Sequence, residues 1–139
     1  MKSATPPPDR LPTIEVSWGE LIDKITILEI KNQRFTSLEA VANVQIELAA
    51  LRRAAHDLQP RPPALDALKT KLKSINKVLW EVEDKIRAKE AAKSFDQQFV
   101  GLARSVYFNN DERARIKREI NKLLNSKFVE EKQYTPYTP

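Results

Sequence analysis

Apolar residues recur along most of the chain in alternating steps of three and four residues, the spacing of helices that pack along one another. One such stripe runs through residues 94–127, where we predict a single helix. Its apolar positions are Phe95, Phe99, Leu102, Val106, Ile116, Ile120 and Leu123. Two polar residues, Asn109 and Arg113, occupy positions on the same stripe. Because buried polar groups need partners, other helices must supply hydrogen-bonding groups for this amide and this guanidinium.

The same spacing predicts three earlier helices, over residues 18–34, 38–58 and 64–92. Three of the four helix starts carry a capping box, in which a Ser or Thr side chain satisfies a free backbone amide of the first turn. The pairs are Ser17 with Glu20, Thr36 with Glu39, and Ser94 with Gln97. The apolar phase slips at the second pair, which predicts a break near residues 35–38. The phase continues through Asn109 and Asn110, which favours an unbroken last helix.

Short connections between the helices predict antiparallel neighbours, so we expect an all-α fold. Its architecture is an elongated antiparallel bundle of three to four long helices with extended N- and C-terminal tails. The helix over residues 18–34 either extends the next helix or folds beside it. The predicted organisation is a flexible Pro-rich arm (residues 1–13), a single helical bundle domain (14–127) and an extended C-terminal tail (128–139).

The composition of the chain excludes several kinds of functional site. The chain contains no cysteine and one histidine, His56. Disulfides and thiolate metal sites are therefore excluded, and the Glu-x-x-His motifs of carboxylate-bridged metal sites are missing. We expect no metal and no cofactor. No segment approaches the roughly 20 apolar residues of a membrane helix, and the N-terminus lacks the apolar core of a signal peptide, so we expect a cytoplasmic protein without a membrane span.

The net charge of +5 at pH 7 raises the question of a polyanionic partner. The positive excess lies in residues 64–93 and 104–132. Binding of single-stranded nucleic acid usually combines a basic track with exposed aromatic side chains. Lys69, Lys73 and Lys77 form a basic stripe, but no aromatic residue lies within it. This pattern therefore does not favour a nucleic-acid partner. A solvated helix face explains the lysines more simply.

Counting residues outward from the predicted turns places a polar layer inside the bundle. The count puts Arg113 level with Asn76 and Glu47, with Asn109 about one turn away. Glu47 is then the carboxylate expected to pair with Arg113. One interpretation is that this layer specifies the register of the helices. The other is a pocket for an anionic small molecule, because arginine binds carboxylate or phosphate with paired donors.

The helix over residues 18–34 carries more apolar surface than one packing stripe requires. Leu21, Ile25 and Leu28 form the stripe, and three isoleucines lie outside it. They are Ile22, Ile27 and Ile30. Uncovered apolar surface often marks an interface, and a symmetric homodimer is the commonest solution. We therefore predict that a second copy or another partner protein packs against this helix.

Four stretches carry a family resemblance: VSWGELIDKITILEIK, LWEVEDKIRAKE, ARSVYFNNDERARIKREIN and EEKQY. Over roughly residues 14–137 the chain resembles an uncharacterised bacterial family of small helical domains, found near genes for glycosyltransferases and other steps of cell-surface polysaccharide assembly. The resemblance implies a link to that process and no particular activity. It points to residues 19–31, 79–90 and 103–121, which are richer in charge than a packing stripe requires.

A looser similarity, of fold type only, links the chain to the all-helical chorismate mutases. Those enzymes place basic and acidic side chains inside a bundle around a dianionic substrate. Lys24, Arg34, Arg87, Arg104 and Arg113 would imitate such a cage. With the polar layer, this leaves no assignable catalytic residue and one set of candidate ligand- or partner-binding residues. They are Lys24, Glu47, Asn76, Arg87, Arg104, Asn109 and Arg113.

These patterns and the family resemblance together predict a non-enzymatic helical binding or assembly module linked to cell-surface polysaccharide synthesis. The alternative is a small enzyme or ligand-binding protein with a pocket for an anionic metabolite inside the bundle. The third hypothesis is a nucleic-acid-binding protein.

Overall fold

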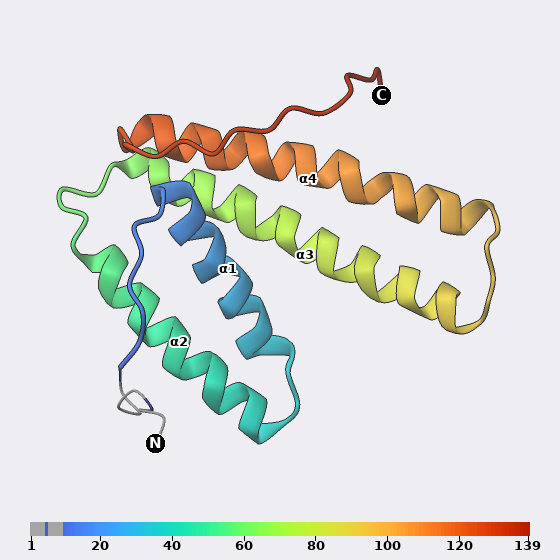
Figure 1. The fold of residues 1–139 in the computed structure, drawn as a ribbon, viewed down its shortest axis with the longest axis horizontal. Helices are drawn as coiled ribbons and strands as arrows, with labels where there is room; N and C mark the ends of the chain where they lie inside the picture. The colour runs from blue at the N-terminus through green and yellow to red at the C-terminus, as the bar shows by residue number, and fades with distance from the viewer. Residues whose placement is uncertain (1–4, 6–9) are drawn as a thin grey trace.

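The computed structural model describes residues 5 and 10–139, and four helices make up most of them. They are α1 (Trp18–Arg34), α2 (Leu38–His56), α3 (Pro63–Ala91) and α4 (Gln97–Leu123) (Figure 1). No strand occurs among the described residues. The all-α class is confirmed, as are the break between the first two helices and the unbroken course of α4 through Asn109.

The helix starts show which capping predictions were correct. The Ser17 Oγ accepts a hydrogen bond from the Glu20 amide at 3.1 Å, as predicted. The second cap is Ser37 rather than Thr36. The third cap is Asp96 rather than Ser94, with the Asp96 carboxylate accepting from the Phe99 amide at 3.0 Å.

The shift of the third cap follows from the way α3 ends. Lys93 adopts a left-handed backbone with φ of 52°. The Ser94 amide then donates to the Lys89 carbonyl at 2.9 Å, and the Lys93 amide donates to the Glu90 carbonyl. Ser94 therefore belongs to the closing turn of α3. The next residue able to cap α4 is Asp96, whose negative charge also favours a helix N-terminus.

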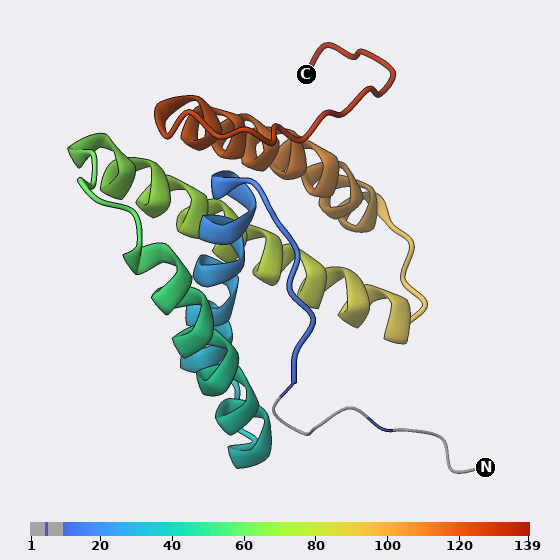
Figure 2. The same ribbon diagram turned by 60° about the vertical axis from the view of Figure 1, so that its left-hand side comes forward.

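Helix α1 is central to the fold, because it contacts each of the other three helices. Helix α2 contacts only α1 among the helices, whereas α3 and α4 pack along one another. The chain thus forms two helical hairpins, α1–α2 and α3–α4, that diverge from each other (Figures 1 and 2). The prediction that α2 and α3 pack as antiparallel neighbours is wrong. The short connection between α2 and α3 suggested that these two helices pack together, but α1 packs against α3 instead.

Two apolar cores lie on different faces of α1. The first joins Leu21, Ile25 and Leu28 to Val44 and Leu48 of α2. The second joins Ile22 to α3 and α4 through Leu65, Leu72, Ile116 and Ile120.

Most of the apolar surface that seemed to be in excess on α1 is covered within the single chain: Ile22 belongs to the second core, Ile30 is buried, and Ile27 is half-buried. Ile22 and Ile30 are 3% and 1% exposed within the single chain. The reason for placing a second chain on α1 therefore fails for Ile22 and Ile30, which the same chain already covers. The existence of a protein partner stays a prediction.

The C-terminal segment doubles back after α4 and runs along it (Figure 1). It has no regular secondary structure beyond Ser126, and the Tyr137 hydroxyl donates to the Asp111 carboxylate of α4. The predicted Pro-rich arm lies largely outside the described residues, and the proposed domain limits stay predictions. None of the described helices is long and apolar enough to cross a membrane.

Candidate functional site

A buried carboxylate on α1 joins three helices. Asp23 is completely buried. Its side chain accepts hydrogen bonds from Asn76 Nδ2 of α3 at 2.9 Å and from Arg113 Nε of α4 at 3.0 Å. A second guanidinium nitrogen of Arg113 donates to the other carboxylate oxygen, and Asn76 also donates to the Thr26 hydroxyl at 2.9 Å. The paired Arg–carboxylate geometry is the strong, directional form of this contact.

A buried lysine extends this network to the C-terminal segment. The side chain of Lys117 is only 8% exposed. Its Nζ lies 2.8 Å from a carboxylate oxygen of Glu20, 2.8 Å from Glu130 and 4.0 Å from Asp23. We call Asp23, Thr26, Asn76, Arg113 and Lys117 the polar cluster.

Electrostatics within the polar cluster are balanced. Burial alone would lower the pKa of Lys117, but its hydrogen bonds to Glu130 and Glu20 outweigh burial and raise that pKa. The hydrogen bond to Asp23 raises the pKa of Arg113, against an opposing effect of burial. The same Lys117 contact lowers the pKa of Glu130. These shifts favour the charged forms of Lys117, Arg113 and Glu130.

Gly19 lets α1 and α4 approach closely enough to form the polar cluster. Its amide donates to the Asn121 side-chain oxygen at 2.7 Å. A Cβ atom at this position would lie 2.6 Å from the Lys117 carbonyl oxygen, closer than side chains normally come. Only glycine fits between these two helices without moving one of them.

The structure brings together two of the candidate residues as predicted, Asn76 and Arg113, but their partner differs. Glu47 is exposed on α2, which does not contact α4, so its predicted pairing with Arg113 is wrong. Asp23 supplies the carboxylate instead. The sequence signal that could have revealed Asp23 is its place between Ile22 and Ile25, since an acid within an apolar run needs a buried partner.

The other candidate residues lie outside the polar cluster. Lys24 is exposed, and Asn109 donates to the Ser105 carbonyl of its own helix at 2.8 Å. Arg104 lies over the Phe108 ring, 5.4 Å from its centroid. Arg87 pairs with Glu83 one turn earlier on α3. The cage of five basic residues expected from the chorismate-mutase similarity is not assembled in one place.

A groove of about 500 Å³ borders the polar cluster between α1, α3 and α4, and we call it the Trp80 groove. Its lining residues are Ile27, Ile30, Asn76, Leu79, Trp80, Glu83, Asp84, Arg87, Asn110 and Arg113. Three candidate residues thus share it. However, Asp23 and Glu83 already pair with its two arginines. The guanidinium of Arg34 also lies over the Trp80 ring, 5.8 Å from its centroid. The groove therefore offers little unpaired positive charge for an anion.

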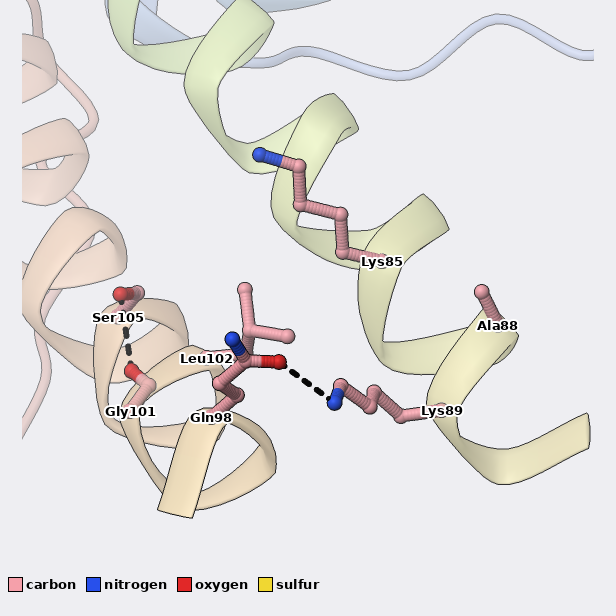
Figure 3. A pocket seen from close by; sticks show the side chains of 7 residues that line it. All are labelled: Lys85, Ala88, Lys89, Gln98, Gly101, Leu102 and Ser105. Atoms are coloured by element: carbon pink, nitrogen blue, oxygen red, sulfur yellow. Dashed lines mark hydrogen bonds between the residues drawn. The ribbon is translucent and has the colours of Figure 1, made fainter. Parts of the chain in front are cut away.

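The far end of the α3–α4 hairpin is built differently, and we call residues 83–105 the distal arm. No residue from Glu83 to Arg115 is buried. A second groove of about 650 Å³, the distal groove, runs between its two helices. Figure 3 shows Lys85, Ala88 and Lys89 on one wall and Gln98, Gly101, Leu102 and Ser105 on the other. Lys89 bridges the walls by donating to the Gln98 side chain at 2.7 Å.

A family model described as a family of unknown function, DUF6165, matches residues 12–139, nearly the whole chain. The chain belongs to this family. The comparison with curated proteins found no match, and neither did the comparison with solved structures. Membership of DUF6165 confirms the resemblance to an uncharacterised family of helical domains. The bacterial origin and the glycosyltransferase context stay predictions, and DUF6165 membership assigns no role to any residue.

The described part of this DUF6165 chain gives no support for a metal site. Among the described residues, no group of three or more His, Cys, Asp or Glu side chains is arranged to hold a metal ion. Those residues also contain no buried side-chain nitrogen or oxygen without a hydrogen-bond partner. The buried polar atoms of the polar cluster are thus all hydrogen-bonded within the chain. The distal groove, in contrast, is a surface groove between two helices.

Proposed function

We propose that this chain is a non-enzymatic helical binding module whose distal arm holds a partner protein. The observation that carries the proposal is the absence of any buried residue from Glu83 to Arg115. Helices in proteins draw most of their stability from packing an apolar face against other elements. Two helices alone leave the flanks of their shared seam uncovered. A partner that packs into the distal groove would complete this region.

Gly101 supports the same conclusion. A glycine inside a helix costs about 1 kcal/mol relative to alanine. At Gly101 a Cβ atom would meet nothing within 4 Å, so no contact inside the described chain requires a glycine there. A glycine on the wall of an open groove allows another backbone to approach closely. We infer that the partner presents a helix to this wall.

Charge indicates the chemistry of that partner. Lys85 lines the distal groove and forms no ion pair with any described residue. Lys89, beside it, already contacts Asp96 at 2.8 Å. The groove surface is largely apolar at Ala88, Gly101 and Leu102. These features fit an amphipathic partner helix with small or apolar side chains toward the groove and an acidic residue near Lys85.

The setting we propose is the cytoplasm of a bacterium, in the assembly of cell-surface polysaccharide, and it rests on the family resemblance alone. The closed polar cluster supports a structural role for Arg113 and Asp23, as opposed to a catalytic one. If deletion of the gene left the surface polysaccharide unchanged, the setting would be wrong while partner binding still stood.

Site-specific photo-crosslinking in the native host tests partner binding. A photoreactive amino acid replaces Ala88 in the distal groove or, as a control, Lys77, which is exposed on α3 outside the groove. We expect one defined crosslinked protein from position 88 and none from position 77. Gly101→Leu, which fills the groove at a position with open space, should abolish the crosslink without unfolding the chain. No crosslink, or the same products at both positions, would overturn the proposal.

The second candidate is a site for an anionic metabolite in the Trp80 groove, which Asn76, Arg87 and Arg113 line, although a ligand there would compete with Asp23 and Glu83 for the two arginines. A ligand that binds the folded state raises the unfolding temperature at saturating concentration. Thermal shift with sugar nucleotides and aromatic dicarboxylates tests this alternative. A dose-dependent rise in wild type that is lost in Arg87→Gln would establish it in place of the partner-binding function.

A further inference from the structure

The outer face of α2 is apolar, and no other helix covers it. Helix α2 buries Val44 and Leu48 against α1 and contacts neither α3 nor α4. Figures 1 and 2 show it at the edge of the molecule. The side of α2 opposite Val44 carries Ile46, which is 69% exposed, at its centre.

Most residues around Ile46 are alanines, and one neighbour, the exposed Asn43, is polar. Ala42 and Ala49 lie one turn to either side of it, and both are exposed. The spacing from 42 to 46 to 49 follows one face of a helix. Leu38, at the start of the same helix, is 88% exposed. Alanines on a helix face allow a second helix to approach closely, so this surface suits helix–helix packing.

The charges at the two ends of this face have opposite signs and equal spacing. Glu39 lies seven residues before Ile46 (46 − 39), and Arg53 lies seven residues after it (53 − 46). Both are exposed, and neither forms an ion pair with a described residue. An antiparallel pair of α2 helices centred on Ile46 would place Glu39 of one copy opposite Arg53 of the other, twice. A parallel pair would place like charges together.

We propose that two copies of this chain associate through antiparallel pairing of their α2 outer faces. The occupant is a second copy because the face is complementary to itself, as a two-fold interface must be. This surface is separate from the distal arm, so the inference does not depend on the proposed partner protein. The dimer would carry two distal arms and would bind a multivalent partner more tightly than one arm does.

The size of the surface sets the expected strength. A helix of 19 residues is about 28 Å long, so one helix pair gives a small interface of the size found in weak or transient complexes. Association should therefore depend on concentration.

Sedimentation equilibrium across a wide concentration range tests the proposal. Wild type should show a monomer–dimer equilibrium. Ile46→Glu, which sets two carboxylates together at the dimer centre, should sediment as a monomer. Val78→Glu, at an exposed apolar position of α3 away from the face, should keep the wild-type equilibrium. Circular dichroism checks that each variant is folded.

Charge reversal makes the test specific to the antiparallel register. Glu39→Arg alone and Arg53→Glu alone should each weaken the dimer about tenfold, and the double variant should restore it to near the wild-type constant. A monomer at every concentration, a dimer insensitive to Ile46→Glu, or no rescue in the double variant would each overturn the proposal. None of these results changes the expected crosslink at position 88, so the two proposals fail separately.

Discussion

The two glycines of the chain lie in regions that are built on different principles. A Cβ atom at Gly19 would come within 2.6 Å of the backbone of α4, whereas one at Gly101 would meet nothing within 4 Å. Around Gly19 three helices converge on the polar cluster, and both apolar cores lie nearby. Around Gly101 two helices form the distal arm without a buried residue. The close approach at Gly19 is completed within the chain, and the open space at Gly101 is where we propose that a partner packs.

The ion pairs of the two regions differ in the same way. In the polar cluster, Asp23 pairs with Arg113, ninety residues later in the chain; Asp23 is buried and Arg113 is partly buried. In the distal arm, pairs such as Glu83–Arg87 and Glu90–Lys93 lie within one turn of α3 and are exposed. Exposed local pairs contribute little to stability. The polar cluster therefore helps to fix the tertiary fold, while the distal arm mainly presents surface.

The largest expected difference between the regions comes from removing the buried carboxylate. Asp23→Ala should lower the free energy of unfolding by about 3 kcal/mol, because it leaves Arg113 and Asn76 without their shared acceptor. Urea denaturation measures the loss. Glu47→Ala, at the exposed carboxylate of α2, is the matched control and should change stability by less than about 0.5 kcal/mol. Equal effects of the two substitutions would contradict a role for Asp23 in holding the helices together.

Gly19→Ala should destabilise the fold by about 2 kcal/mol, even though alanine favours helix formation. The added methyl group meets the backbone carbonyl of Lys117 and the Asn121 side chain, so α1 must move away from α4. Thermal and urea unfolding measure the change. A stabilised variant would mean that α1 and α4 are not held at this separation in solution.

Gly101→Ala should stabilise the fold, in contrast to Gly19→Ala. We expect the free energy of unfolding to rise by about 1 kcal/mol. The position is helical, and the added methyl group enters open space. The same unfolding measurements apply. Destabilisation by this substitution would show that the distal arm packs against something in the isolated protein.

The smallest effect concerns the contact between the polar cluster and the C-terminal segment. The hydrogen bond from Lys117 holds the pKa of Glu130 below its ordinary value of 4.5. A group whose pKa is lowered on folding stabilises the fold above its unfolded pKa, and that contribution is lost as pH falls through the folded pKa. Because Glu130 is partly exposed, the change in global stability should stay below about 1 kcal/mol.

Nuclear magnetic resonance can follow this contact directly. Between pH 6 and pH 3, the signals of residues 128–131 and of Lys117 should shift together in wild type. In Glu130→Gln this titration step should be missing. Wild-type signals that stay constant over the range would mean that Lys117 does not hold the C-terminal segment.

The four helices, the break after α1 and the unbroken α4 could all be predicted because the signals are local. A repeat of three and four residues and a capping side chain act within a few turns of the chain. The same logic correctly placed Asn76 and Arg113 at one level, since α3 and α4 are joined by a short connection and do pack antiparallel. Cap positions moved by one or two residues where neighbouring side chains compete for the same amides.

The partner of Arg113 and the direction of α2 depend on packing between distant segments, which no local pattern encodes. A short connection limits how far α3 can lie from the end of α2, but it does not determine which helix covers which face. Helix α1 is apolar on two sides and packs against α2 on one side and against the α3–α4 hairpin on the other. That arrangement buries Asp23 against Arg113 and leaves Glu47 in solvent. It also buries Ile22 against α3 and α4 and leaves Ile46 of α2 exposed, which no pattern along α1 or α2 alone decides.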